Sequence, residues 1–455
     1  MGTRKLVNRN RNRDNTRSSS STPDFVLTWG KRKRVRAKST SSSQPPPSRG
    51  QTEPIKSSSF VLQWGRKKRL RCRKVATATE HVTAAILSFI PDDIILDILT
   101  RLPVKSLLRF RCVCKFWYEL LKTSNFAELH LNLSLKYGYD GIVYNHVGKI
   151  SCVDYDSLVS STTLASTLSN MVAHIDYPLE HRMERILGTC NGLVCYLTSQ
   201  KDIIIWNPCT KDYKQIPTPP EIINTKSRGI HVLYKYGFGY DLKTEDYKVA
   251  RIANIRDKYS EIAVYSLKLN LWKMYGDIPV RSPYEDLVLF EGIFHWVELP
   301  PSGSQRPRMI FSFDTGSQIL NRIPLPQHFS DKFNMIHVRL LGGCLYLIGS
   351  LYMTCSEAWM MRDYGVHESW TKMFSIDNTK YTGLTHLDIR QYYRNGLILV
   401  HEAHFYTYLY NLNHDEAIKL KVVDGIPLGF QSWPFLGSLV SPNLGIDSSS
   451  RIQES

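Results

Sequence analysis

From about residue 141 onward, the chain repeats a unit of short apolar strands and turns with a period close to 50 residues. Equivalent positions of successive units are 59, 48, 49 and 48 residues apart at Trp206, Tyr265, Phe313, Arg362 and Tyr410. A weaker unit near Val153 precedes them. A single four-stranded sheet cannot bury both of its faces, so stacked repeats of this length are typical of propeller blades.

About 300 residues divided by this period predict about six blades, so we expect an all-β, propeller-like domain over residues 140–440. A pair of β-sandwich domains is the alternative. The nearly apolar run 340–355 is too short to span a bilayer, and we interpret it as two buried strands with a turn at Gly349-Ser350. Five tryptophans are expected to pack between blades: Trp206, Trp272, Trp296, Trp359 and Trp370.

Residues 86–133 are predicted to form a small helical module, because their apolar side chains recur at helical spacing. A first helix would begin at Pro91 and stop before Pro103. A second would begin near Val104, and a third would end near Asn125. Three short helices bury little surface, so their surplus apolar side chains indicate docking on a partner protein or packing on a neighbouring domain.

The first 80 residues are rich in Ser, Arg, Lys and Pro, and we predict that they are disordered. Residues 1–75 contain 21 Lys or Arg and 3 Asp or Glu, so the rest of the chain is close to neutral within the total charge of +17. FVLTWGKRKRVR (25–36) is repeated as FVLQWGRKKRLR (60–71). Residues 441–455 are expected to be a flexible C-terminus.

The basic halves of this repeat resemble nuclear-import signals. Their residues are Lys31, Arg32, Lys33, Arg34, Arg66, Lys67, Lys68 and Arg69. An importin is the partner that such clusters would bind, and direct binding to nucleic acid or no specific role are the alternatives. The apolar start of each copy is not needed for import, and the sequence assigns no role to it.

The run RLPVKSLLRFRCVCK (101–115), preceded by IPDD and followed closely by Trp117, resembles the F-box of plant F-box proteins. In that family the F-box docks on the Skp adaptor of an SCF ubiquitin ligase, and the adaptor connects it to the cullin scaffold. By resemblance, the adaptor-binding positions are Pro91, Ile94, Ile95, Leu99, Leu102, Pro103, Val104, Leu108, Val113, Cys114, Lys115 and Trp117. The chain departs from the family pattern at Ile90 and at Phe116.

The stretches CNGLVCY, WNPCT and YGFGYD, in this order, resemble the F-box-associated or kelch-like domain of the same proteins. In that family this domain captures the protein that is to be ubiquitinated. The resemblance covers residues 86 to about 440, without the tail, and implies a non-catalytic substrate-recognition subunit. The basic clusters of the tail lead us to expect this subunit in nucleus and cytoplasm. The resemblance does not name the target protein, the pathway, or any modification that the target needs.

Patterns of catalytic or cofactor-binding residues are not evident, and we expect no cofactor, no metal site and no membrane segment. Gly237 and Gly239 lack the third glycine of a dinucleotide-binding turn. Nine scattered cysteines do not indicate a disulfide framework. Two alternatives remain open: a nuclear nucleic-acid-binding regulator acting through the tail, and a propeller enzyme with a metal or a carboxylate pair in its axial channel.

Overall fold

The computed structural model describes part of the chain. The described residues are 91–137, 141–146, 149–154, 173–175, 183–220, 232–255, 259–278, 285–298, 308–327, 329–380, 386–393, 396–402, 406–419 and 431–443. They all belong to one compact unit, Ala76–Ser455. The predicted disordered tail, its duplicated motif with both basic clusters, and residues 444–455 lie outside the described residues.

The helical module contains four described helices, where the sequence predicted three. They are α2 (Asp92–Thr100), α3 (Val104–Phe110), α4 (Lys115–Leu120) and α5 (Ser124–Tyr137). The predicted third helix corresponds to α4, which ends at Leu120 and not near Asn125, and a fourth helix, α5, follows Thr123. The hydroxyl of Thr123 accepts a hydrogen bond from the backbone N–H of Phe126 at 3.2 Å, as a helix-capping residue does.

Proline precedes both of the first two helices, as the sequence indicated. Pro91 and Pro103 have extended backbone angles and stand directly before α2 and α3. Within the module, Leu99, Leu107 and Leu121 are almost fully buried and share one cluster with Phe126. Leu439, from the C-terminal end of the described chain, joins this cluster. None of the described helices is long and apolar enough to cross a membrane.

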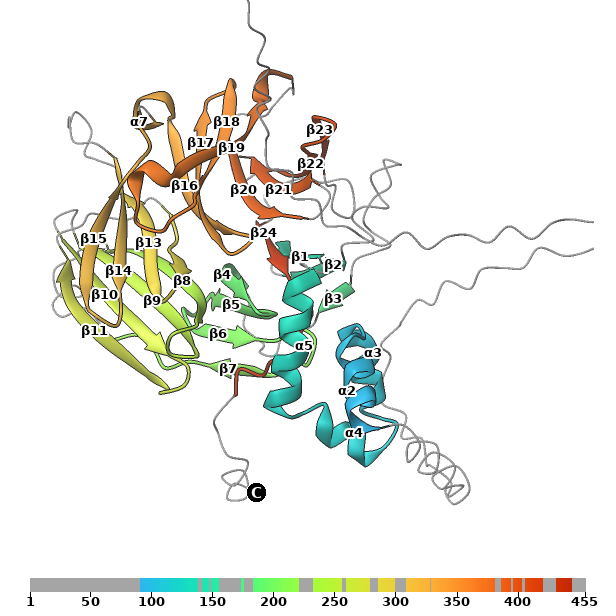
Figure 1. Ribbon diagram of the computed structural model, residues 1–455. Coiled ribbons are helices and arrows are strands. Elements are labelled where there is room, and N and C mark those ends of the chain that lie inside the picture. Colours follow the sequence, from blue (N-terminus) through green and yellow to red (C-terminus); the bar gives the residue numbers. More distant parts are fainter. Residues whose placement is uncertain are drawn as a thin grey trace, which may run out of the picture. The chain divides into compact units, whose positions relative to one another are not determined.

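Among the described residues, the strands form six four-stranded antiparallel sheets, which can be followed by their labels in Figure 1. Blade 1 combines β24 (Gln431–Phe435) with β1 (Gly141–His146), β2 (Lys149–Asp154) and β3 (Ala173–Ile175). Blade 2 contains β4 (Met183–Cys190), β5 (Leu193–Thr198), β6 (Ile203–Trp206) and β7 (Tyr213–Gln215). Blade 3 contains β8 (Val232–Asp241), β9 (Asp246–Ile255), β10 (Tyr259–Ser266) and β11 (Leu271–Ile278).

Three further blades complete the ring. Blade 4 contains β12 (Val288–Phe290), β13 (Ile293–Glu298), β14 (Met309–Asp314) and β15 (Ile319–Pro324). The short helix α7 (Phe329–Lys332) leads to blade 5, with β16 (Met335–Leu341), β17 (Cys344–Leu351), β18 (Cys355–Met361) and β19 (Trp370–Asp377). Blade 6 contains β20 (Leu387–Tyr392), β21 (Leu397–Glu402), β22 (Tyr406–Asn411) and β23 (Glu416–Lys419). The 3₁₀ turns η4 (His367–Ser369) and η5 (Asn378–Lys380) flank β19.

The predicted six-bladed propeller is therefore confirmed, and the sandwich alternative is wrong. Each position used to measure the period lies in the third strand of a blade or directly after it. The first strands of the blades contact one another around the ring, in the order β24, β4, β8, β12, β16 and β20. They therefore surround the propeller axis.

The ring is closed by the C-terminal strand. β24 pairs antiparallel with β1, with Val143 opposite Trp433. Asn207, in the WNPCT stretch, holds the segment that follows β24: its buried amide donates hydrogen bonds to the carbonyl oxygens of Ser438 (3.1 Å) and Val440 (2.7 Å). The first blade thus unites the two ends of the domain, which prevents an open sheet edge.

The predicted tryptophans pack between neighbouring blades. Trp206 shares a cluster with Val143 and Phe435 of blade 1, and Trp296 shares one with Ile252 of blade 3. The other three, Trp272, Trp359 and Trp370, also contribute to clusters that join two blades. The predicted inter-blade role of these side chains is confirmed.

Glycines allow close packing at two places. A Cβ atom on Gly237 would lie 2.8 Å from the backbone oxygen of Leu287, so the Gly-x-Gly stretch lets β8 approach the next blade. The predicted turn at Gly349-Ser350 is wrong, because both residues lie inside β17 and the turn is at Gly342-Gly343. A Cβ atom on Gly349 would lie 2.5 Å from the Phe329 ring, so this glycine accommodates α7.

Candidate functional site: an exposed apolar face and an axial channel

The helical module exposes large apolar side chains outside its own core. Ile94, Ile98, Val113, Phe116 and Tyr118 are 48, 51, 54, 53 and 39% exposed, and we call them the apolar set. Ile94 and Ile98 are one helical turn apart, on the same side of α2. Five such side chains within 25 residues are unusual for a surface that faces only water, and they indicate a protein-binding face.

The structure separates the predicted adaptor-binding residues into three groups. Buried in the module are Ile95, Leu99 and Val104. Half-buried are Leu102, Leu108, Cys114 and Trp117. Exposed are Pro91, Ile94, Pro103, Val113 and Lys115. The first group stabilises the module itself, whereas the other two groups and the apolar set have surface that a partner could contact.

Three members of the apolar set, Ile98, Phe116 and Tyr118, were not assigned to the site from the sequence. Ile98 belongs to the apolar stripe of α2, but the stripe alone does not separate an inner from an outer edge. The signal that could have found it is its i+4 spacing from Ile94, which places both side chains along one edge of the stripe, beside the buried Ile95 and Leu99. Phe116 stood out only as a departure from the family pattern.

A cavity of about 610 Å³ lies on the propeller axis. Inner strands of all six blades line it, and Leu135 of α5 also contributes. Its charged and aromatic lining includes Arg185, Lys235, Glu285, Arg339, Arg390 and Trp433. Its volume falls within the range of ligand-binding pockets, roughly 300–1,000 Å³.

An arginine lies at the centre of the charged cluster in this channel. Arg339 contacts Asp388 through two nitrogens, at 2.8 and 2.7 Å, and its Nη2 atom lies 2.5 Å from Glu285. Burial alone would raise the pKa values of both carboxyl groups, but Arg339 outweighs burial and holds both pKa values below the usual range. The same two carboxylates raise the pKa of Arg339 against the effect of burial.

A second ion pair lines the channel beside this cluster. Arg185 donates to both carboxylate oxygens of Asp286, at 3.0 and 3.3 Å. One oxygen of Asp286 also accepts the backbone N–H of Tyr236 at 3.0 Å, and the Arg185 guanidinium lies over the Tyr236 ring. The pair therefore links blade 2, blade 3 and the chain before β12.

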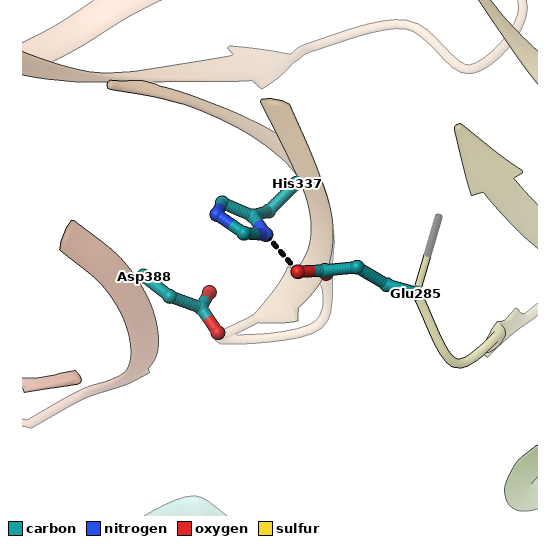
Figure 2. Close-up of side chains that lie close together, drawn as sticks. All are labelled: Glu285, His337 and Asp388. Carbon is teal, nitrogen blue, oxygen red and sulfur yellow. Dashed lines mark ion pairs between the residues drawn. The ribbon is translucent and has the colours of Figure 1, made fainter. Parts of the chain in front are cut away.

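Glu285, His337 and Asp388 bring potential metal-binding atoms within 4.8 Å of one another. In Figure 2 the His337 ring points at the Glu285 carboxylate, with which it forms an ion pair. Arg339, however, bridges the two carboxylates. A divalent cation would have to displace this guanidinium or lie beside it, so the donor set suits an ion-pair cluster better than a metal.

A pair of carboxylates in the channel would indicate glycoside hydrolysis. Glu285 and Asp388 do not suit this reaction. One carboxylic acid of such a pair must keep its proton near neutral pH, through a raised pKa. Here the pKa values of Glu285 and Asp388 are lowered by Arg339, so both groups are ionised. Neither can act as the general acid.

The charged channel residues were not found from the sequence, although a signal exists. Arg185, Lys235 and Glu285 are each 50 residues apart, and Arg339 and Arg390 continue the series at 54 and 51. This is the blade period, so each residue occupies the channel-facing part of its own blade. A search for charged residues that recur with the repeat would have placed them on one axis.

Two families of known domains match this chain. Residues 145–425 match the F-box associated beta propeller domain, and residues 87–129 match the F-box domain. The chain belongs to the F-box proteins with an F-box associated beta propeller. The resemblance of the two sequence halves to this family is thereby confirmed.

Relatives of this F-box protein occur in Arabidopsis thaliana. It is 27% identical over 368 residues to F-box/kelch-repeat protein At3g23880, which covers 78% of this chain and 96% of that protein. It is 29% identical over 321 residues to F-box protein CPR1, covering 65% and 74%. A solved nidogen/laminin complex aligns over 65% of this chain and 98% of that chain, with 9% identity and a TM-score of 0.41, and we base no argument on it.

F-box proteins are in general adaptor subunits of ubiquitin ligases, and the F-box implies binding to a Skp-type adaptor. F-box and propeller together fit a substrate receptor of an SCF ligase.

Proposed function

We propose that this F-box protein is the substrate-recognition subunit of an SCF ubiquitin ligase. Its helical module binds the Skp adaptor, which connects it to the cullin scaffold, and its propeller holds a target protein for ubiquitination and degradation. The observation that carries the proposal is the apolar set: the core of the module, which Leu439 joins, leaves these five large apolar side chains exposed.

The contribution of such a subunit to ubiquitin transfer is proximity. A target held near the conjugating enzyme reacts at a high effective concentration, without any catalytic group on the receptor. The carboxylates of the channel fit a receptor without catalytic groups, because each of them is paired with a guanidinium group. The enzyme alternative is not favoured, because Arg339 pairs with both Glu285 and Asp388.

Replacement of Ile98 by glutamate is expected to weaken adaptor binding strongly. The change puts a charge into an apolar interface, and a loss of about 2 kcal/mol, or roughly 30-fold in affinity, is typical for a central interface residue. Ile98 is half exposed, so the module should still fold. The measurement is co-purification of the full chain with a co-expressed plant Skp adaptor.

Leu269→Glu is the matched control, because Leu269 is 66% exposed in the turn between β10 and β11 of the propeller. Both variants should unfold at the wild-type temperature, and only Ile98→Glu should lose the adaptor. Leu102 and Leu108 are less suitable positions, because both pack against the core of the module. Equal adaptor recovery with Ile98→Glu and with Leu269→Glu would refute the proposed docking face.

We further propose that the protein acts in both nucleus and cytoplasm, with import through the basic clusters that begin at Lys31 and Arg66. The support comes from the sequence alone, since both clusters lie outside the described residues. Alanine replacement of all eight basic residues should shift a fluorescent fusion from the nucleus to the cytoplasm. An unchanged distribution in microscopy would remove the import role.

A further inference from the structure

Arg390 is only partly satisfied by the charged cluster of the channel. Its Nε atom lies 2.7 Å from Asp388, and its guanidinium lies over the Trp433 ring at 4.9 Å from the ring centre. Within the described part of the chain, its two terminal nitrogens make no hydrogen bond, and they are not among the fully buried polar atoms. Four N–H groups of a cavity-lining arginine are therefore available to a ligand.

The ion pairs of the channel leave Arg390 with only a share of one carboxylate. Asp286 is paired with Arg185, and Glu285 is paired with Arg339. Asp388 is shared by Arg339 and Arg390, so one carboxylate serves two guanidinium groups. Lys235 also lines the cavity.

Burial adds to this shortage of acceptors at Arg390. It lowers the pKa of Arg390 from its usual value, and the attraction of Asp388 opposes but does not cancel the effect. The charged guanidinium is thus less stable here than in water. An anion that accepts its terminal N–H groups would restore the lost interactions and would itself be bound by charge-assisted hydrogen bonds.

We propose that the axial channel binds one oxyanion group, a carboxylate or a phosphate, carried by an acidic segment of the target protein. Arg390, fixed on the Trp433 ring, would donate its terminal N–H groups to the oxyanion, and Lys235 would add its charge. The planar guanidinium offers two parallel donors, which match the two oxygens of a carboxylate or phosphate. The inference that the channel binds a target protein rests on the proposed function. Binding of the oxyanion itself does not require the adaptor.

A cation is a poorer occupant of the same cavity. The three carboxylates near the channel are all in ion pairs with arginine, so a cation would have to break one of these pairs. A purely apolar ligand would leave the terminal N–H groups of Arg390 without acceptors in a confined space, which is unfavourable for a buried charge. The channel chemistry therefore favours an anionic group.

The test uses the full chain and three five-residue peptides that are blocked at both ends and carry glycines around one central residue. The central residue is glutamate, phosphoserine or glutamine, and binding is measured by ligand-observed NMR titration. The glutamate and phosphoserine peptides should bind at least about tenfold more tightly than the glutamine peptide, because they make charge-assisted hydrogen bonds. Acetate and inorganic phosphate serve as free-anion probes and should bind more weakly than the peptides.

Arg390→Met keeps the chain over Trp433 and removes the guanidinium. Its affinity for the glutamate peptide should fall about tenfold or more, and Arg390→Lys should retain part of the binding. Arg322→Met is the control, since Arg322 lies over the Phe311 ring at 5.4 Å on the exposed strand β15, outside the cavity lining. If Arg390→Met does not fold, the preference of the wild-type chain for glutamate over glutamine decides the question.

Equal binding of the glutamate and glutamine peptides, or no binding of any probe, would overturn the proposal. Tighter binding of free phosphate or acetate than of the peptides would overturn the assignment to a protein segment. These outcomes can be told apart from failure of the proposed function, because adaptor binding depends on the apolar set. A chain that retains the adaptor but binds no oxyanion would keep its ligase role and lose only this site.

Discussion

Replacing Arg339 by methionine is expected to lower the free energy of unfolding by about 3–5 kcal/mol, because removing one partner of a buried ion pair leaves the other charge uncompensated. Arg339 contacts both Glu285 and Asp388, and all three side chains are at most one-fifth exposed. Methionine fills a similar volume but offers no charge. Urea unfolding at pH 7 measures the change.

The pH dependence gives this prediction a second readout. The folded-state pKa values of Glu285 and Asp388 are lowered, so their contribution to stability is present above their unfolded pKa values, near 4, and is lost as the pH falls below them. Without Arg339, both pKa values should lie higher than in the wild-type protein. The difference between variant and wild type should therefore shrink from pH 7 towards pH 3.

Arg322→Met again serves as the control, and it should change the free energy of unfolding by less than about 1 kcal/mol, since this arginine is exposed. The same loss of stability in both variants, with no dependence on pH, would show that the channel cluster is not held by Arg339.

Truncation after residue 430 is expected to abolish cooperative unfolding of the propeller. It removes β24, the inner strand of blade 1, and with it the pairing to β1. It also removes Leu439 from the core of the helical module and both carbonyl partners of Asn207. An open ring would expose apolar inter-blade surface and a strand edge, so aggregation should follow.

Near-ultraviolet circular dichroism and thermal unfolding measure the effect of this truncation. A chain that ends at residue 443 keeps every described residue and separates the role of β24 from that of residues 444–455. A synthetic peptide of residues 431–443 should restore a cooperative transition, whereas a scrambled peptide should not. A wild-type transition in the chain that ends at residue 430 would contradict the closure by β24.

Much of the fold could be predicted from the sequence because blades repeat. Trp206, Tyr265 and Phe313 occupy the same strand of successive blades, so the packing between blades imposes similar residues at one period. Pro91 and Pro103 likewise marked two helix starts, because proline has a local conformational effect. Signals of this kind depend on near neighbours or on repetition.

Other features depend on contacts that one sequence does not display. Gly349 resembles a turn residue, but its function is to make room for Phe329, twenty residues earlier. Ile95 and Ile98 belong to one apolar stripe, and only the packing of α2 on its neighbours buries the first and exposes the second. The pair Arg339 and Asp388 joins two blades, so no local pattern indicates it.

Calorimetric titration of the full chain with a plant Skp adaptor tests the central claim most directly. We predict one adaptor bound per chain with a negative heat-capacity change, since apolar surface is buried on binding. The complex should be lost with Ile98→Glu and unchanged with Arg390→Met, whose side chain lies in the propeller channel. A wild-type chain that folds cooperatively but releases no heat of binding to the adaptor at any temperature would contradict the account.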